Sequence, residues 1–281
     1  MPRLQDWIGR QETADDTLTA APLTGWRATL DQPDGPAQPG DALPPLTHWL
    51  YFLPHARASE IGPDGHPRRG GFLPPVDLPR RMWAGGRVRF HQRLHIGDAV
   101  QRVSTIKDVR EKHGRSGALV FVVVEHRIHG PGGLAVVEEH DIVYRDPPAA
   151  DAPPPPPRAS DKTAVWHEAM RADPVLLFRY SALTFNGHRI HYDRPYAVEE
   201  EGYPGLVVHG PLIATLLADL AALAARHAGG RPLTRFDYRV ERPIFDVDPF
   251  SLNGAPVGER AAEVWSLDHS GAVSMVAEAE W

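Results

Sequence analysis

The segment 211–227, P-L-I-A-T-L-L-A-D-L-A-A-L-A-A-R-H, constrains the fold of this chain more than any other stretch. Pro211 suits the first turn of a helix, and Gly229 and Gly230 follow the expected helix end. Apolar residues point in nearly every direction around this helix, which predicts that it is buried on all sides. A curved antiparallel sheet wrapped around one central helix satisfies this requirement.

Strand patterns follow this helix and recur in the first half of the chain. Alternating or apolar runs broken by glycine turns predict strands at 88–96, 99–109, 119–129, 135–144, 234–240, 250–257, 260–268 and 272–281. A strand is also expected at 176–183, a helix start within 13–30 with a break at Pro22, and a loop at 54–85. We therefore predict an α+β fold whose halves each place a helix before an antiparallel meander. Two such halves can pair into one continuous sheet, which hides edge strands.

A proline run marks the predicted boundary between two domains. Residues 146–158 read D-P-P-A-A-D-A-P-P-P-P-P-R, and consecutive prolines cannot occupy a helix interior or a central strand. Such a run favours an extended polyproline spacer. We predict an N-terminal domain at 1–146, a linker at 147–158 and a C-terminal domain at 159–281. A long ordered surface loop inside one domain is the alternative.

The composition excludes several classes of partner and chemistry. Hydrophobic residues make up 42% of the 281 residues and charged residues 23%, as in folded globular proteins. The net charge of −6 gives no reason to expect nucleic acid or a membrane as a partner. No apolar run reaches the length of a membrane span, and the first residues lack a signal-peptide core. The absence of cysteine excludes thiolate chemistry and fits a reducing compartment, so a cytoplasmic location is expected.

A polar cluster precedes the predicted central helix. The stretch 186–193, N-G-H-R-I-H-Y-D, places two histidines between an asparagine and an aspartate, just after a short apolar run. The stretch 207–211, V-V-H-G-P, follows and leads directly into the helix. Buried polar groups are costly unless they are paired. A cluster of this kind ahead of a helix start is therefore a candidate site.

These residues resemble the motif of the hot-dog-fold (R)-specific enoyl-thioester hydratases and dehydratases, the MaoC-like group. That motif is Asp-x-Asn-Pro-x-His, followed by a small-residue turn around His-Gly before the central helix. The same spacing here is Asn186-Gly187-His188-Arg189-Ile190-His191. The stretch F-N-G-H-R-I-H-Y-D is similar to the 3-hydroxyacyl-thioester dehydratase subgroup that includes mesaconyl-CoA and itaconyl-CoA hydratases. The resemblance implies a double hot-dog fold with a degenerate N-terminal half.

The sequence departs from this motif at Asn186, where the wider family has an aspartate. An amide cannot take a proton at neutral pH, so Asn186 is expected to hold and orient the catalytic water. His191 is the expected acid and base, because an imidazole titrates near neutrality. A histidine that only bonds a loop carbonyl is the alternative. Gly210 is expected to offer a free backbone N–H to the thioester oxygen, with no side chain to block its approach.

Further residues around the motif are expected to contact the substrate, and each has a structural alternative. The set is His188, Arg189, Tyr180, His209 and Arg194. A guanidinium fork suits a substrate carboxylate or a CoA phosphate, although a solvated surface arginine explains each position too. The histidines and the tyrosine are also explained by packing. Asp193 is expected to cap a turn, and the segment 68–75 resembles a loop near the active site of this subgroup.

No metal or cofactor is expected. His188 and His191 lack an obvious third ligand, and Arg189 lies between them. The chain also has neither a glycine-rich phosphate loop after a strand nor a Gly-x-Ser-x-Gly elbow, which disfavours nucleotide binding and serine hydrolysis.

The expected function is (R)-specific hydration of 2-enoyl-CoA thioesters and the reverse dehydration of 3-hydroxyacyl-CoA thioesters, with mesaconyl-CoA or itaconyl-CoA as candidate substrates. A dehydratase acting on acyl carrier protein is the alternative within this class. A thioesterase using Asp193 or Glu199 and a non-catalytic acyl-thioester-binding protein are alternatives of other classes; Asn186 supports the last. The expected partner is an acyl-CoA substrate, and the sequence leaves a homodimer or higher homo-oligomer open.

Overall fold

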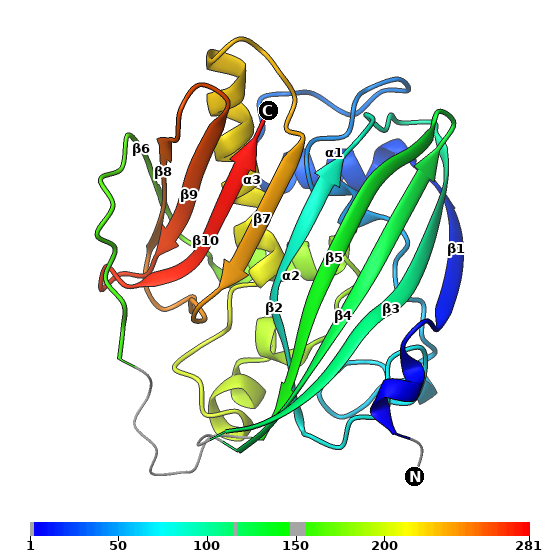
Figure 1. Cartoon of the computed structure of the whole chain (residues 1–281). Helices are drawn as coiled ribbons and strands as arrows, with labels where there is room; N and C mark the ends of the chain where they lie inside the picture. The colour runs from blue at the N-terminus through cyan, green and yellow to red at the C-terminus, as the bar shows by residue number, and fades with distance from the viewer. Residues whose placement is uncertain (1–2, 115–116, 147–155) are drawn as a thin grey trace.

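One continuous antiparallel sheet with helices on one face forms the framework of the molecule (Figure 1). The structure is a computed structural model and describes residues 3–114, 117–146 and 156–281. The strands in these residues are β1 (Gln11–Thr17), β2 (Arg80–Phe90), β3 (Ala99–Gly114), β4 (Gly117–Gly130), β5 (Gly133–Arg145), β6 (Trp166–Met170), β7 (Arg235–Val240), β8 (Phe250–Pro256), β9 (Ala261–Leu267) and β10 (Val273–Glu280). The helices are α1 (Ala20–Thr29), α2 (Pro174–Leu183) and α3 (Gly210–His227), with short turns η1 (Leu4–Trp7), η2 (Thr47–Leu50), η3 (Ala58–Glu60), η4 (Arg189–His191) and η5 (Tyr196–Glu200).

The strand order repeats in mirror image about the centre of the sheet. It runs β1-β3-β4-β5-β2 and then β7-β10-β9-β8-β6, so each strand of the first half has a counterpart in the second. The halves join where β2 pairs antiparallel with β7, from Gly85 opposite Arg239 to Arg89 opposite Arg235. The expected continuous sheet is confirmed, as is the α+β class. The division at 1–146 and 159–281 stays a proposal, and most of the predicted linker, 147–155, lies outside the described residues.

Two glycines allow the halves to approach closely at this junction. A Cβ on Gly85 would lie 2.5 Å from the Tyr238 carbonyl oxygen, and a Cβ on Gly86 would lie 2.3 Å from the Tyr238 hydroxyl. Real side chains do not tolerate such distances, so the Gly85-Gly86 pair is required for β2 to pack over Tyr238. The Tyr238 ring of the second half therefore packs directly against β2 of the first half.

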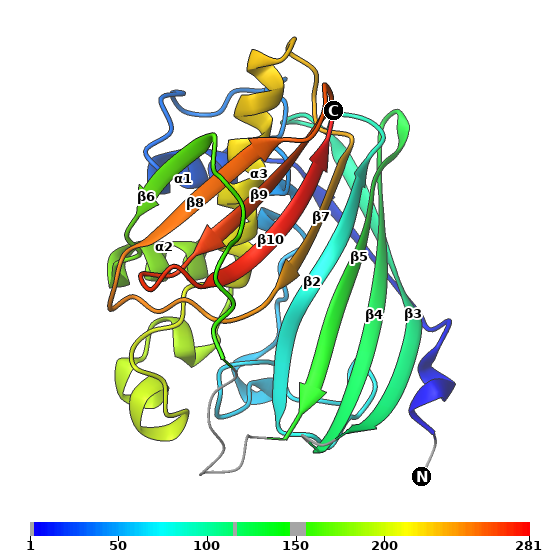
Figure 2. The ribbon, with the colours of Figure 1, turned by 60° about the vertical axis from the view of Figure 1, so that its left-hand side comes forward.

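The central helix α3 lies against the strands of the second half, as expected from its apolar sequence (Figure 2). Leu212, Ala214, Leu217, Ala218 and Ala221 are all fully buried. In the first half, the described chain between β1 and β2 forms α1 and two 3₁₀ turns in place of a long helix. The degenerate first half stays a prediction.

Several local predictions are wrong, and capping explains the clearest of them. The segment 176–183 is helix α2, not a strand, because Asp173 accepts the Leu176 N–H at 2.8 Å and Pro174 occupies the first turn. Pro22 does not break its helix, since it lies in the first turn of α1, where a missing N–H costs nothing. Strands β1 and β6 were not predicted, β2 begins inside the expected loop at 54–85, and the strand expected at 88–96 ends at Phe90.

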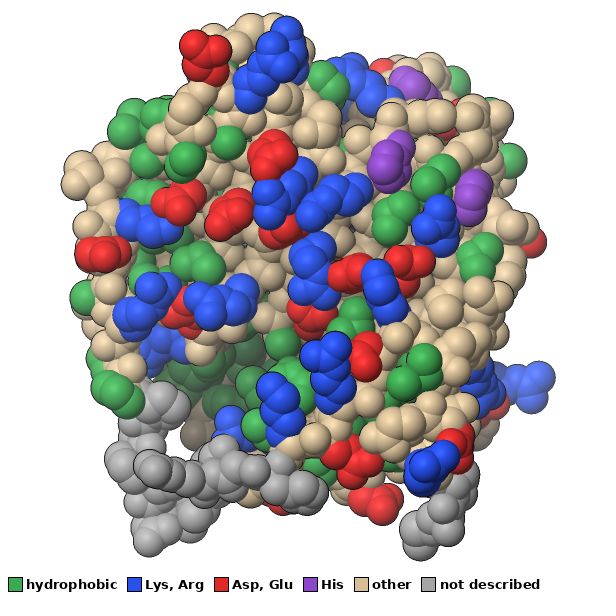
Figure 3. Space-filling view, in the orientation of Figure 1, with side chains coloured by type: hydrophobic (Ala, Val, Ile, Leu, Met, Phe, Trp, Pro, Cys, Tyr) green, Lys and Arg blue, Asp and Glu red, His purple; other side chains and the backbone are tan. Residues whose placement is uncertain are grey.

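The outer face of the sheet is covered by intermingled acidic and basic side chains (Figure 3). Arg87 bonds Glu139 at 2.5 Å and Asp141 at 2.7 Å, and Arg89 pairs with Asp237 across the junction of the halves. Exposed pairs of this kind contribute little stability each, but they keep this face hydrated. In the described residues, no helix is long and apolar enough to cross a membrane.

Candidate active site

A tight turn after α2 orients the predicted motif. Phe185 adopts a left-handed conformation with φ 49°, and the Asn186 Oδ1 accepts the His188 N–H at 3.0 Å. The Tyr192 hydroxyl donates to the Gly187 carbonyl at 2.9 Å and closes the turn from the other side. Side-chain bonds of this type replace the backbone bonds that a loop lacks. The turn then enters η4, which directs His191 into the interior.

His191 has the geometry of a neutral general base. Its side chain is buried, and its Nδ1 lies 2.7 Å from the Val207 carbonyl oxygen. A carbonyl can only accept, so Nδ1 carries the proton and Nε2 is left as an acceptor. Burial lowers the pKa of His191 to about 4, although the bond to Val207 opposes this shift. The ring is therefore uncharged at neutral pH and able to accept a proton.

The His209 ring packs against the His191 ring. The two imidazole rings stack with centroids 3.7 Å apart and planes 17° apart. His209 is fully buried, its Nε2 lies 2.8 Å from the Ser181 Oγ, and its ring meets Tyr180 edge-on at 5.0 Å. Burial also lowers the pKa of His209 well below its usual value. Of the two alternatives for Tyr180 and His209, the geometry fits a packed layer beneath His191 better than direct substrate contact.

The first turn of α3 begins beside this layer, immediately after His209. The Ile213 N–H bonds the His209 carbonyl at 3.1 Å, which leaves the earlier N–H of Gly210 outside the helical bonding pattern. A Cβ on Gly210 would lie 2.6 Å from the Trp83 ring. This contact gives a second reason for a glycine here, beside the expected approach of the thioester, which stays a prediction. Its missing side chain makes room for an indole from β2, and the Gly210 N–H remains the candidate donor.

A loop from the first half meets the motif turn directly. The Arg189 N–H donates to the Asp64 carbonyl at 2.9 Å, and a Cβ on Gly65 would lie only 1.8 Å from the Gly187 carbonyl oxygen. Gly65 also has φ +88°, a left-handed conformation that favours glycine. Only glycine fits this contact, so the loop containing Gly65 and the motif turn are locked together.

This loop adds two residues that the sequence analysis missed. Asp64 lies 3.1 Å from the His66 Nδ1, and the His66 ring lies 4.0 Å from the His188 ring. The His66 contact holds the pKa of Asp64 well below its usual value, and burial lowers the pKa of His188 to about 2. The His188 ring in turn meets His191 edge-on at 5.4 Å. The Asp64-Gly65 dipeptide is a turn signal, but nothing local in the sequence connects it to residue 188.

The two arginines that were expected to contact the substrate, Arg189 and Arg194, form bonds within the chain instead. Arg189 bonds Asp193 at 2.7 Å and the Pro63 carbonyl at 3.0 Å, and it stacks over Tyr196. Arg194 pairs with the buried Asp246. Both guanidinium groups therefore hold loops in place, a structural role that differs from the solvated surface arginine considered as the alternative. Asp193 also accepts the Tyr196 N–H at 3.3 Å, which fits the expected cap.

The segment expected near the active site, 68–75, lies mainly beside the site. Arg69 donates to the carbonyl oxygens of Val76, Leu78 and Pro79, and Phe72 and Leu73 pack against a second apolar core. The residues that reach the motif come from the stretch just before this segment, 63–66.

Asp64, His66 and His188 could together hold a metal ion, since one ligand atom from each lies within 4.8 Å of the others. The expectation that no further ligand lies near His188 is therefore wrong, because the fold brings Asp64 and His66 to it. In the described geometry the Asp64 carboxylate is already bonded to both the His66 ring and the His66 N–H. This bonding makes Asp64 and His66 a hydrogen-bonded pair, and we derive no metal chemistry from the group.

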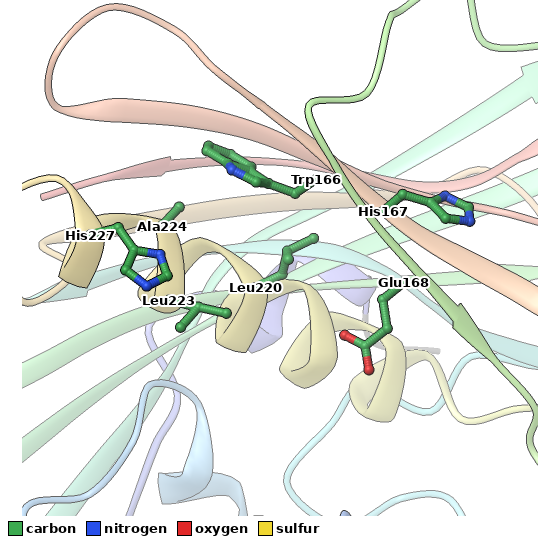
Figure 4. A pocket seen from close by; sticks show the side chains of 7 residues that line it. All are labelled: Trp166, His167, Glu168, Leu220, Leu223, Ala224 and His227. Atoms are coloured by element: carbon green, nitrogen blue, oxygen red, sulfur yellow. The ribbon is translucent and has the colours of Figure 1, made fainter.

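Two surface hollows lie away from this cluster. One, of about 320 Å³, lies between β6 and α3 and is lined by Trp166, Glu168 and Leu223 among others (Figure 4). The other, of about 470 Å³, lies on the outer face of the sheet around Arg87 and Lys107. Neither is lined by a residue of the predicted site.

Comparison with known proteins shows the family of this chain. The profile of the hydroxyacyl-thioester dehydratase type 2 family matches residues 46–246. The chain belongs to this family. The mesaconyl-C(4)-CoA hydratase of Chloroflexus aurantiacus is 49% identical over 254 residues, which cover 90% of this chain and 89% of that protein. The family consists of dehydratases, so the expectation of a hydro-lyase is confirmed.

Solved structures confirm the fold. HtdX of Mycobacterium tuberculosis aligns with a TM-score of 0.66 at 19% identity, covering 96% of this chain and 99% of that one. A second protein of Mycobacterium tuberculosis, described as having a double hot-dog fold, aligns with a TM-score of 0.57 at 14% identity over 97% and 96% of the two chains. The predicted double hot-dog is therefore confirmed.

Proposed function

We propose that this protein hydrates mesaconyl-C4-CoA or a closely related 2-enoyl-CoA thioester, with His191 as the acid and base. The observation that carries this proposal is the His191 tautomer. The Val207 carbonyl fixes the proton on Nδ1, so the opposite nitrogen is a free acceptor beside the N-terminus of α3. The high identity to a mesaconyl-C(4)-CoA hydratase supports the choice of substrate.

The proposed reaction adds one water molecule across the double bond. The His191 Nε2 takes a proton from water while the water oxygen bonds to the β-carbon. The displaced electron pair moves through the α-carbon to the thioester oxygen, where the Gly210 N–H stabilises the enolate. The protonated His191 then returns the proton to the α-carbon, and the enolate collapses to the 3-hydroxyacyl thioester. The same steps in reverse are the dehydration.

Asn186 orients the attacking water in this scheme. Its Oδ1 accepts the His188 N–H, which fixes the amide and leaves the NH₂ group to donate to the water oxygen. Such a donor leaves the water's protons free for His191. His188 lies between Asn186 and the loop of the first half, where it would contact the acyl group.

A substrate panel tests this function. The enoyl absorbance of mesaconyl-C4-CoA and crotonyl-CoA is expected to fall on incubation with the enzyme, with the corresponding 3-hydroxyacyl ester as product. Itaconyl-CoA, whose exomethylene double bond is not conjugated with a C4 thioester, is followed by chromatography of the hydrated ester. Release of free CoA thiol would instead support the thioesterase. That alternative is disfavoured by its candidate carboxylates, since Asp193 is bonded to Arg189 and Glu199 is exposed. CoA-ester binding without turnover would support the non-catalytic alternative, and turnover of acyl carrier protein esters alone would support the remaining one.

The proposal also includes a cytoplasmic location and a homo-oligomeric state. A CoA thioester substrate and a chain without cysteine suit the cytoplasm. The outer strands β1 and β6 leave unpaired sheet edges, which a homodimer could cover. Light scattering of the purified protein measures the oligomeric state directly.

A further inference from the structure

Arg81 is directed into the interior on the side of the candidate site. It lies opposite Tyr144 in the pairing of β2 with β5, and the Tyr144 side chain is 2% exposed. Direct cross-strand partners project from the same face of a sheet. The Arg81 side chain therefore points towards the helices and not towards the ion pairs of the outer face.

Arg81 also differs from the other arginines of its strand. Each of those has a carboxylate partner: Arg80 has Glu201, Arg87 has Glu139 and Asp141, and Arg89 has Asp237. Among the residues that the structure describes, Arg81 forms no ion pair. Its nearest polar contact is the Tyr144 hydroxyl, which is neutral, so the charge of this partly buried cation is not balanced by a carboxylate. An unbalanced charge of this kind is costly, which is a reason to look for the anion that it meets.

The position of Arg81 relative to the reacting groups follows from Trp83. Residues two apart on a strand share a face and lie about 6.5 Å apart. Trp83 packs on Gly210 at the start of α3, so Arg81 lies one such step along β2 from the residue that contacts the candidate oxyanion donor. The charge of Arg81 also lowers the pKa of both His66 and His188, secondary to burial, which agrees with an inward-pointing guanidinium on the side of these rings.

The substrate of the proposed function brings an anion to this place. In mesaconyl-C4-CoA the β-carbon carries a methyl group and a free carboxylate. The β-carbon must lie beside the water held by His191, so the carboxylate attached to it lies within one bond of that centre. A guanidinium fork binds carboxylate with two parallel hydrogen bonds, which Arg189 and Arg194 cannot do while they hold their loops.

We propose that Arg81 binds the free carboxylate of the acyl group and so selects dicarboxylic enoyl-CoA esters over neutral ones. His66 and His188 are the polar neighbours of this carboxylate subsite. Asp64 is the nearby acidic group. Its carboxylate is hydrogen-bonded to the backbone N–H and the ring of His66, so it has a partner other than the substrate. This assignment rests on the proposed hydratase function and adds its specificity.

The test compares two substrates that differ only at the carboxylate. In 3-methylcrotonyl-CoA a methyl group replaces the carboxylate of mesaconyl-C4-CoA. Arg81→Gln is expected to lower kcat/KM for mesaconyl-C4-CoA by about 100-fold, because a charge-assisted bidentate contact is lost, and to change kcat/KM for the neutral ester less than about threefold. Arg93→Gln, which removes an exposed arginine, is the matched control and is expected to change neither.

Each other outcome overturns the assignment in a recognisable way. Equal loss on both esters, or loss on neither, means that Arg81 does not contact the carboxylate. Wild-type enzyme that hydrates only the neutral ester removes the dicarboxylic substrate and Arg81's role, but leaves the hydratase. Wild-type enzyme that hydrates neither ester removes both proposals. If Arg81→Gln fails to fold, Arg81→Lys keeps the charge without the fork and is expected to lose about tenfold on mesaconyl-C4-CoA alone.

Discussion

The imidazole rings of His191 and His209 stack at 3.7 Å, and this contact makes the reactivity of His191 depend on a residue that never meets solvent. His209 is fixed by Ser181 and lies immediately before the central helix. The stack therefore aligns the candidate base with the N-terminus of α3. The His191 Nδ1 is also hydrogen-bonded to the Val207 carbonyl, so the His191 ring has little freedom to rotate.

Removal of the His191 imidazole is expected to abolish catalysis without unfolding the protein. His191→Ala is expected to lower kcat for mesaconyl-C4-CoA by about 1,000-fold, which is typical of losing a general acid and base. Asn186→Ala is expected to cost only about tenfold, since other groups can still hold the water. Initial rates measure both, and circular dichroism checks the fold. Near-native turnover by His191→Ala would show that another residue is the base.

The pH dependence of the reaction is expected to follow the neutral form of His191. The pKa of His191 is lowered to about 4, mainly by burial, so the base is uncharged and active above that value. We expect kcat/KM to be flat from pH 8 to about pH 5.5 and to fall as pH approaches 4. Initial rates after brief exposure to each pH give the profile. An inflection near pH 6.5 would mean that the base is a solvated histidine.

The same shift makes acid destabilise the fold. In the unfolded chain a histidine has a pKa near 6.5, so between pH 6.5 and about 4 the unfolded state binds a proton that folded His191 does not. The free energy of unfolding therefore falls as pH drops through this window, by up to roughly 3 kcal/mol from His191 alone. Urea unfolding at several pH values measures it. His191→Gln is expected to make the profile shallower, with the remaining slope coming from other buried histidines such as His188 and His209. His227→Gln, at an exposed position, is expected to leave the profile unchanged.

The contact between Gly65 and Gly187 is expected to tolerate no side chain. Gly65→Ala places a Cβ 1.8 Å from the Gly187 carbonyl oxygen, so the two loops must separate and hydration is expected to be lost. Gly70→Ala is the matched control, because Gly70 has a similar φ of +94° but nothing within 4 Å of a built Cβ. It is expected to lose about 1 kcal/mol of stability through backbone strain and to remain active. Equal activity of the two variants would argue against a contribution of this loop to the site.

Local patterns in the sequence predicted the parts of the molecule that depend on neighbouring residues. Residue spacing identifies two kinds of element here. The apolar stretch that forms α3 has the composition of a buried helix, and the runs between glycine turns have the alternation of strands. The spacing from Asn186 to His191 likewise fixes a turn and an inward histidine. The helix α2 was missed because its apolar run has no clear period, and the decisive signal was the Asp173 cap.

The contacts between the two halves could not be predicted in this way. Asp64 and His66 reach His188 because β2 pairs with β7 and brings distant loops together. Arg81 looks like any other basic residue in the sequence, and only its register opposite Tyr144 shows that it points inward. Such placements depend on the complete sheet, whereas composition and spacing describe one segment at a time.

The lock between Gly65 and Gly187 also fixes when activity appears during folding. The two loops come from opposite halves, so they can meet only after both halves have formed and joined at β2 and β7. Contacts between residues so distant in sequence form slowly, because a long stretch of chain must be ordered first. Refolding from denaturant is therefore expected to restore secondary structure before it restores turnover, because His191 is expected to meet the loop of the first half only in the last step.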